Sequence, residues 1–479
     1  MGKNATADAL TLVIDIGKSH AKLLMVDAAG TVVERHGRDN TSVVSPLGYL
    51  ALDVHGLQHW MQTTLRHSAQ VARCQQVIAS THGAAVVALS DNGLAWAPLD
   101  YEYDGLASSA SLASAFAAAS DGFQSNLSPE LPAGLNAARQ LFWMQNTHPE
   151  AWGRTRCLVP YPQYWAWVLS GVVATEVSSL GCHTHLWNPQ AASYSTLASA
   201  QGWASLFAPL RSAWEVLGPV RPELARAWGL PASCRVHVGV HDSNACLARY
   251  FGAGDALTVV SSGTWTVLMA PGAPTVALQA ERDMLGNVDV LGRATPTARF
   301  MGGREFTVLL DGAAPGAATL ADAQKIIASQ TMALPSFARE GGPFKDRDGW
   351  IQRAGQRWNG ALSQGLSAGE RSALAALYCA QVSAFLVERL WAGATPPQRT
   401  LIVEGPLAHN ALYLSALQAL LPDHSCQYST DALEGTARGA WLLCHWPAGP
   451  RKAQLEHSPS YDLEGLAAYH AQWLALLAS

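Results

Sequence analysis

The sequence predicts an α/β fold divided into two domains. A chain of 479 residues is too long for one hydrophobic core, and strand-like and helix-like segments alternate along it. An internal repeat is the third observation: two apolar hairpins carry turn glycines, Gly17 and Gly263, that lie 246 residues apart. Two domains that begin with the same hairpin would give this spacing, with a boundary near residues 252–254. The alternative is a chance match of two common hairpins.

Composition excludes several classes of protein. Hydrophobic residues make up 49% of the chain and charged residues 14%, which argues against disorder. The net charge is −5 and no basic tract occurs, so we do not expect a nucleic-acid partner. The first residues lack the pattern of a signal peptide, and polar residues interrupt the longest apolar stretches, so no membrane partner is expected. The eight cysteines form no C-x-x-C pair, which favours a reducing cytoplasm.

The first hairpin, residues 10–25, carries groups suited to an anion. A glycine turn lets backbone N–H groups approach phosphate oxygens, and hydroxyl or ammonium groups can complete such a site. Asp15 could hold magnesium through water. A Walker A loop is rejected because Leu12 stands where that motif needs its first glycine. The predicted phosphate-binding residues are Gly17, Lys18, Ser19 and Lys22; an ordinary solvated turn is the alternative for one hairpin taken alone.

The second hairpin, residues 257–269, has a small, hydroxyl-rich turn made of Ser261, Ser262, Gly263 and Thr264. Two such turns on facing domains would contact one triphosphate from both sides. The pair is therefore stronger support for nucleotide binding than either turn alone.

Asp242 follows an expected strand at residues 236–240 and precedes helix-like sequence at 244–248. Ligands of α/β folds bind at the carboxyl ends of strands, so this carboxylate is a candidate general base. The alternative is that Asp242 only caps the helix, as aspartate often does.

Further elements fit the two-domain layout. A short strand at 77–79 runs into His82, and a strand at 400–403 runs into Glu404 and Gly405. The clearest helix is expected over 367–391, where Ser367 and Glu370 have capping-box spacing. Tyr164, Trp165 and Trp167 would either stack on a ligand or pack in the core.

Four of these segments together resemble the FGGY carbohydrate kinases. They are the hairpin Asp15 to Lys22, the strand end Gly239 to Ala245, the turn Ser261 to Trp265 and the late segment Glu434 to Ala440, in the family's order. The resemblance covers residues 11–443 or so. It implies two actin-like (ribonuclease H-like) domains with a central cleft, 1–252 binding sugar and 253–479 binding nucleotide.

The resemblance implies a role for each matching residue. Asp242 would be the base that takes the proton from the attacking sugar hydroxyl. The sugar would be bound by His82, Asp100 and Glu102. Gly17, Lys18 and Ser19 would form the first phosphate loop, Asp15 would take the magnesium-linked position, and Ser262, Gly263 and Thr264 would form the second loop. Gly405 would bind adenosine. ATP and magnesium are the implied cofactors.

Departures from the family pattern limit what can be transferred. Lys18 stands where the family has threonine, which adds a cation beside the phosphates. The adenosine motif, normally three glycines, reads Glu404-Gly405-Pro406, and the W-N-D-Q-R segment lacks its arginine, with Asp104 near that position. No individual sugar can be carried over.

The function predicted from the sequence is ATP-dependent phosphorylation of a small sugar, with a ketose such as xylulose, rhamnulose or fuculose as acceptor. Three alternatives remain: a kinase for a polyol, one for an aldonic acid, and an actin-like ATP-dependent switch without a sugar pocket. The partners expected are the sugar and ATP, and a homodimer is left open.

Overall fold

The computed structural model describes residues 9–107, 109–316, 318–338, 341–394, 399–430, 435–450 and 453–478. Glu434, the first residue of the late segment, lies outside these ranges. The chain forms two compact units: unit 1 comprises residues 1–249, 286–294 and 434–451, and unit 2 comprises 250–285, 295–433 and 452–479. Both units are therefore discontinuous in sequence. The assignment of sugar to 1–252 and nucleotide to 253–479 stays a prediction.

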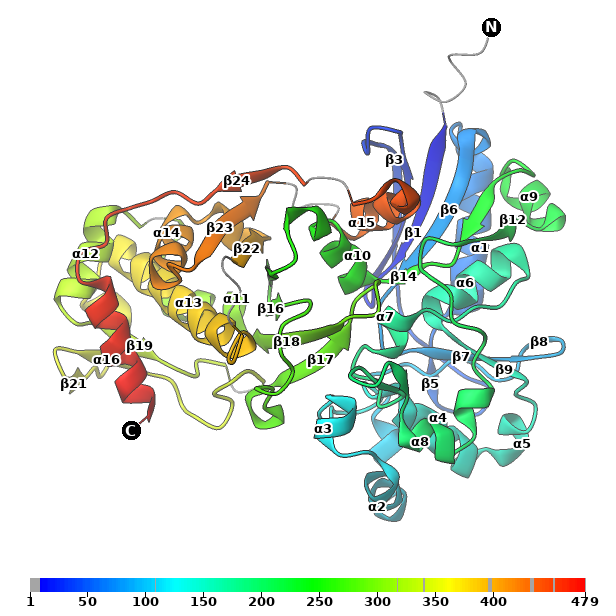
Figure 1. Ribbon diagram of the computed structural model, residues 1–479, viewed down its shortest axis with the longest axis horizontal. Helices are drawn as coiled ribbons and strands as arrows, with labels where there is room; N and C mark the ends of the chain where they lie inside the picture. The colour runs from blue at the N-terminus through cyan, green and yellow to red at the C-terminus, as the bar shows by residue number, and fades with distance from the viewer. Residues whose placement is uncertain are drawn as a thin grey trace, which may run out of the picture. The chain divides into compact units, whose positions relative to one another are not determined.

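Unit 1 is built on a mixed sheet (Figure 1). Along β12-β13-β6-β1-β2-β3, the strand β1 is antiparallel to β2 and parallel to β6. All seven residues of β1 are buried because the strand is central, whereas β3 alternates between half-buried and exposed residues at the edge. The strands are β1 (Leu10–Ile16), β2 (His20–Val26), β3 (Val32–Asp39), β6 (Cys74–Thr81), β12 (Val216–Pro219), β13 (Arg235–His237) and β14 (Val240–His241), which pairs with β6.

Helices and smaller sheets complete unit 1. One hydrophobic core is formed by the main sheet together with side chains of α1, α6 and α9. A second core is formed around the sheet β8-β7-β9 and α4. The helices are α1 (Val54–His67), α2 (Ala110–Ala119), α3 (Phe123–Asn126), α4 (Ala137–Thr147), α5 (Pro149–Trp152), α6 (Tyr161–Ser170), α7 (Val177–Leu180), α8 (Thr196–Ala200), α9 (Pro222–Trp228), α10 (Asp242–Ala248) and α15 (Gly435–Leu443). The short strands are β4 (Val43–Val44), β5 (Leu50–Ala51), β7 (Val86–Ser90), β8 (Gly93–Leu94), β9 (Cys157–Pro160), β10 (Trp187–Asn188) and β11 (Ser193–Tyr194).

The prediction of one strand over residues 236–240 is wrong in one respect: the segment forms two short strands, β13 and β14. Gly239, between them, has a φ of +92°, and a Cβ at this position would lie 2.7 Å from the carbonyl oxygen of Ala79. Only glycine fits so close to β6 with that backbone conformation. The break still leaves β14 paired with β6.

The second main sheet, most of whose strands belong to unit 2, has the order β17-β18-β16-β15-β22-β23-β24. The hairpin predicted at 257–269 is β15 and β16, antiparallel, and β22 and β23 continue in parallel from β15. The strands are β15 (Leu257–Ser262), β16 (Thr266–Met269), β17 (Met284–Val288), β18 (Ala294–Phe300), β22 (Arg399–Glu404), β23 (His424–Ser429) and β24 (Leu455–His457); a small separate sheet joins β19 (Met332–Leu334), β20 (Trp350–Arg353) and β21 (Gln356–Arg357).

The long helix of unit 2 is α13 (Ala368–Leu390), which packs against α11 (Gly302–Leu310), α12 (Leu320–Ala328) and α14 (Ala411–Leu420); α16 (Leu466–Ala478) packs on α14. Ser367 caps α13, and the predicted capping box with Glu370 is present. By length and composition α13 could cross a membrane, but 89% of its most apolar stretch is buried inside the fold. It is therefore placed as a core helix.

The two main sheets repeat one topology. In each, an antiparallel hairpin with a third antiparallel strand adjoins a parallel strand: β3-β2-β1-β6 in unit 1 and β18-β16-β15-β22 in unit 2. This arrangement confirms the predicted α/β fold of two actin-like, ribonuclease H-like domains. The echo between Gly17 and Gly263 thus reflects equivalent positions in two equivalent sheets.

The helix that carries Asp242 depends on a close helix contact. Gly439 of α15 lies against α10, and a Cβ at Gly439 would lie 1.8 Å from the carbonyl oxygen of Ala245. Gly439→Ala should lower stability by about 2–3 kcal/mol, since the backbone of α10 must move. Thermal unfolding tests this, with Gly122→Ala as control because Gly122 has open space around its Cβ position and an ordinary φ of −63°. Equal melting temperatures for the two variants would contradict the contact.

Candidate active site

Three parallel strands of unit 1 end at the same edge of its sheet. Asp15 of β1 lies opposite Ser80 of β6, and Val240 of β14 lies opposite the same residue. His82 follows β6, and Asp242 comes directly after β14. Because the carboxyl ends of neighbouring parallel strands meet at one edge, the sheet brings Asp15, His82 and Asp242 to that edge.

Asp242 keeps one carboxylate oxygen uncommitted. It is the first residue of α10, and the N-cap position belongs to His241. Oδ1 accepts a hydrogen bond from the backbone N–H of Ser243 at 2.6 Å and lies 3.2 Å from Nε2 of His241. Oδ2 has no hydrogen bond to the described residues, and the side chain is 28% exposed. Asp242 is thus not the N-cap residue, and Oδ2 is open to a substrate hydroxyl.

His82 presents a buried hydrogen-bond acceptor near this carboxylate. Its Nδ1 lies 2.9 Å from the carbonyl oxygen of Gly83, so Nδ1 carries the proton and Nε2 has the lone pair. Nε2 is buried and has no partner among the described residues. The rings of Tyr101 and Tyr161 lie 5.3 and 5.2 Å from the imidazole. Burial lowers the pKa of His82, and the hydrogen bond to Gly83 and the charge of Asp242 offset this only in part, so the ring is neutral at pH 7.

Lys18, predicted to contact phosphates, points its ammonium group at carboxylates. Nζ forms an ion pair with Asp100, lies 3.2 Å from Oε2 of Glu102 and donates to the hydroxyl of Ser42 at 3.2 Å. Burial alone would raise the pKa of Asp100, but the hydrogen bonds from Lys18 and Ser42 outweigh it and hold that pKa below its usual value. Asp100 is therefore an ionised, paired carboxylate.

The rest of the first hairpin turn is compact. The N–H of Gly17 donates to the carbonyl oxygen of His20 at 2.9 Å, and the hydroxyl of Ser19 lies 2.9 Å from Nδ1 of His20. Nζ of Lys22 lies 4.0 Å from Oδ2 of Asp15. The phosphate-binding role of Gly17, Ser19 and Lys22 stays a prediction.

Asp15 could hold magnesium only together with other ligands. The described residues contain no cluster of three or more His, Cys, Asp or Glu side chains that could bind a metal. Magnesium usually keeps several waters and is held by one or two carboxylates plus substrate phosphates. A single carboxylate at the edge of the sheet fits that mode, through water, and does not fit a site made of protein ligands alone.

In unit 2 the second predicted phosphate loop and the predicted adenosine turn are in direct contact. The hydroxyl of Ser262 donates to the carbonyl oxygen of Glu404 at 2.6 Å and accepts from the N–H of Leu407 at 2.9 Å. Gly405 has a φ of +78°, and a Cβ there would lie 2.0 Å from the carbonyl oxygen of Ser262. The hydroxyl proton of Ser262 is therefore used inside the protein and is not available to a phosphate oxygen.

Two further contacts hold the predicted second phosphate loop. Glu404, the acid that replaces a glycine of the family motif, is buried and accepts a hydrogen bond from the Tyr250 hydroxyl at 2.7 Å. A Cβ on Gly303, near the start of α11, would lie 2.2 Å from the carbonyl oxygen of Gly263. The turn of Gly263 and Thr264 therefore rests on α11.

Sequence reasoning missed Ser42, Tyr101 and His241 as members of the site. Ser42 belongs to no motif and reaches Asp100 only through the fold. Tyr101 lies between the predicted residues Asp100 and Glu102, and His241 precedes Asp242, but only the structure shows their contacts with His82 and Asp242. The aromatic residues Tyr164 and Trp165 are 3% and 0% exposed in the core, which excludes stacking on a sugar.

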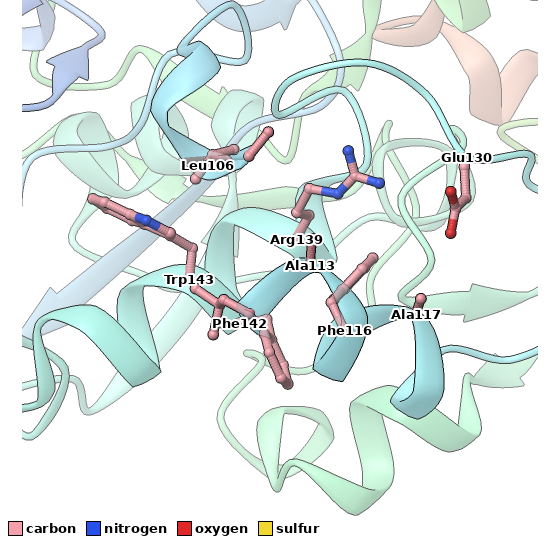
Figure 2. Close-up of a pocket in the computed structure, with 10 residues that line it drawn as sticks. Leu106, Ala113, Phe116, Ala117, Glu130, Arg139, Phe142 and Trp143 are labelled. Carbon is pink, nitrogen blue, oxygen red and sulfur yellow. The ribbon is translucent and has the colours of Figure 1, made fainter. Parts of the chain in front are cut away.

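A separate cavity in unit 1 contains none of the predicted site residues. It has a volume of about 130 Å³ and is lined mostly by apolar side chains of α2 and α4, including Phe116, Phe142 and Trp143, with Arg139 and Glu130 as its charged members (Figure 2). The Arg139 guanidinium lies 5.4 Å from the ring centre of Phe116. Its apolar lining sets it apart from the polar strand edge.

Comparison with known proteins agrees with this architecture. Residues 126–248 match the N-terminal domain of the FGGY family of carbohydrate kinases, and residues 254–453 match the C-terminal domain of carbohydrate kinase FGGY. A solved carbohydrate kinase from Novosphingobium aromaticivorans is 33% identical, with 98% of each chain covered and a TM-score of 0.86. The chain belongs to the FGGY family of carbohydrate kinases.

Other FGGY relatives are more distant or match in part. L-fuculokinase of Haemophilus influenzae is 31% identical over 144 residues, which is 28% of this chain and 29% of that protein. The match to the curated relative thus spans less than a third of its length. Xylulose kinase of Lactobacillus acidophilus is 12% identical with a TM-score of 0.75, covering 98% of this chain and 97% of that one, and shares the fold.

Proposed function

We propose that this FGGY protein is an ATP-dependent kinase that phosphorylates a hydroxyl of a small, uncharged sugar, with a ketose such as fuculose, xylulose or rhamnulose as acceptor. One observation carries the proposal: Oδ2 of Asp242 and Nε2 of His82, neither of which has a hydrogen-bond partner among the described residues, lie where neighbouring strands end at one sheet edge. A general base and an acceptor for a second hydroxyl are what a polyhydroxyl substrate requires. The L-fuculokinase relative supports a ketose.

The charges around this edge argue against an aldonic acid. Asp100, Glu102 and Asp242 are carboxylates, and Lys18 is the cation paired with the first two. A carboxylate on the substrate would add a like charge to a region that is already negative, which costs binding free energy. A neutral ketose or polyol has no such penalty.

The mechanism follows from phosphoryl transfer. The transition state carries negative charge on the transferred group, so catalysis depends on positioning and on cationic or N–H donors. Asp242 would accept the proton of the attacking hydroxyl through Oδ2, while His82 would hold a neighbouring hydroxyl. ATP would be bound by the backbone of Ser262, Gly263 and Thr264 and by the turn at Gly405. Magnesium, held by Asp15 through water, would supply charge neutralisation.

An actin-like switch that only binds ATP is the second candidate. Such a protein has no need for a neutral histidine and an open carboxylate at one sheet edge. The paired arrangement of His82 and Asp242 therefore favours the kinase.

Steady-state ADP release with a panel of acceptors tests the proposal. L-fuculose, D-xylulose, L-rhamnulose, a polyol (glycerol) and an aldonic acid (gluconate) are compared at saturating ATP and magnesium. We expect turnover with at least one ketose and none with gluconate. ATP binding without acceptor-dependent turnover across the panel would favour the switch, and turnover on gluconate would overturn the charge argument.

Replacing His82 by phenylalanine should raise the KM for the sugar about tenfold, because a substrate hydroxyl loses its acceptor. The KM for ATP should not change. Phenylalanine keeps a ring between Tyr101 and Tyr161, so packing is retained. Initial rates at varied sugar and at varied ATP separate the two constants. An unchanged sugar KM would remove His82 from the sugar site.

We also propose a cytoplasmic location, which agrees with the eight cysteines being free thiols. The proposed partners are the sugar and ATP.

A further inference from the structure

The polar contacts of the Lys18 ammonium group with the described residues all lie inside unit 1. Nζ donates hydrogen bonds to the Asp100 carboxylate and, at 3.2 Å, to the hydroxyl of Ser42. It also forms ion pairs with Asp100 and with Oε2 of Glu102, the latter at 3.2 Å. The side chain of Lys18 is 21% exposed. Its charge is therefore directed at carboxylates, not at the open side of the turn.

Asp100 depends on this contact. Its side chain is 0% exposed, and a buried carboxylate is stable only when it is paired and hydrogen-bonded. Oδ2 accepts from Lys18 and from Ser42, and Oδ1 accepts from the backbone N–H of Glu102 at 2.8 Å. Of these partners, only Lys18 carries a positive charge. Without Lys18 the carboxylate would be buried with no counter-charge.

The loop fixed by Asp100 leads to the proposed sugar site. Nζ of Lys18 lies 5.3 Å from the ring centre of Tyr101, a cation–π distance. The Tyr101 ring in turn meets the His82 ring edge-on, with centres 5.3 Å apart and an interplanar angle of 82°. A continuous set of contacts thus runs from Lys18 to the imidazole of His82, whose Nε2 has no partner in the described part of the chain.

We propose that Lys18 is a positioning residue of the acceptor-sugar site and that its ammonium does not bind the phosphates of ATP. It acts by neutralising Asp100 and by fixing the loop that carries Tyr101 and Glu102 against His82. The inference rests on the proposed kinase function and extends it, since it assigns Lys18, a residue of the first hairpin turn, to acceptor recognition.

The test is a split between two Michaelis constants. Lys18→Met should raise the KM for the best ketose of the panel at least about tenfold and leave the KM for ATP within about twofold, because only the sugar side loses its support. Lys18→Arg, which keeps the charge beside Asp100, should restore most of the sugar affinity. Lys325 is an exposed lysine on α12 whose Nζ lies 3.9 Å from Oε1 of Glu370. Lys325→Met is therefore the matched control and should change neither Michaelis constant.

A double-mutant cycle identifies the partner. Asp100→Asn removes the buried charge, so Lys18→Met added to it should raise the sugar KM much less than in the wild-type background. Additive effects would show that Lys18 acts on something other than Asp100 and would overturn the inference. Ser42→Ala, a smaller change in the same cluster, should raise the sugar KM in the same direction if Lys18→Met does not fold.

The two failures are distinguishable. If Lys18→Met raises the ATP KM and leaves the sugar KM unchanged, Lys18 binds phosphates and the inference is wrong while the kinase stands. If the wild-type protein binds ATP, measured by calorimetry, but phosphorylates none of the acceptors, the kinase proposal fails and the inference fails with it.

Discussion

Asp242→Ala should lower kcat by about 100-fold or more, because a positioned general base contributes 10²–10⁴-fold. The reason is Oδ2 of Asp242, directly after β14. The described residues donate no hydrogen bond to this oxygen, so it can accept the proton of a substrate hydroxyl. The KM for ATP should change little, since the loop that is proposed to bind nucleotide belongs to unit 2. Rapid-quench or steady-state ADP assays at saturating ketose measure the loss.

Two controls accompany this variant. Asp242→Asn keeps the shape and the hydrogen bond from Ser243 but cannot accept the proton, so it should lose activity to a similar degree. Asp462→Ala removes an exposed carboxylate in unit 2 and should leave kcat unchanged. Near-normal turnover in Asp242→Asn, with an unchanged melting temperature, would exclude Asp242 as the base.

Gly405→Ala should disrupt the loop that is proposed to bind the nucleotide. At φ +78° and ψ −164° the backbone is in a region that is essentially restricted to glycine, at a cost of about 1–3 kcal/mol. The added Cβ would also lie 2.0 Å from the carbonyl oxygen of Ser262, so the loop of Ser262 and Gly263 must move. We expect the KM for ATP to rise about tenfold or more, the energetic equivalent of about 1.4 kcal/mol.

The variant Gly393→Ala separates the effect of backbone strain from that of the steric clash between a Cβ at position 405 and Ser262. Gly393 has a similar φ of +82°, but a Cβ there would meet no atom of the described residues within 4 Å. Both variants should lose some stability, measured by thermal unfolding, whereas only Gly405→Ala should lose ATP affinity, measured by calorimetry. Equal ATP affinity in the two variants would contradict a role for this turn in nucleotide binding.

The sequence predicts those parts of the fold that depend on local pattern. Three features of the fold follow from such local signals: the two hairpins, from their apolar runs and glycine turns, and the capping box of Ser367 and Glu370. All three are present. The strand at 236–240 is broken because Gly239 must pass close to Ala79, a contact distant in sequence. Local patterns carry no information about such contacts.

The candidate site divides in the same way. His82 and Asp242 are predictable because each follows a strand, and ends of parallel strands meet. The partners of Lys18 are not predictable from the sequence, since Asp100 is 82 residues away and Ser42 belongs to no motif. Glu404 looks out of place in the sequence, yet it is held by the Tyr250 hydroxyl, 154 residues distant. Long-range polar pairs thus decide where charge is available to a ligand.

The most direct test of the proposed function is detection of the product. Purified protein, ATP with magnesium and L-fuculose or D-xylulose are followed by phosphorus NMR, with Asp242→Asn in parallel. The kinase proposal predicts a new sugar-phosphate ester signal that grows with ADP in the wild type and is nearly absent in the variant. Formation of ADP and free phosphate at one rate with or without sugar, and the same in both proteins, would contradict it.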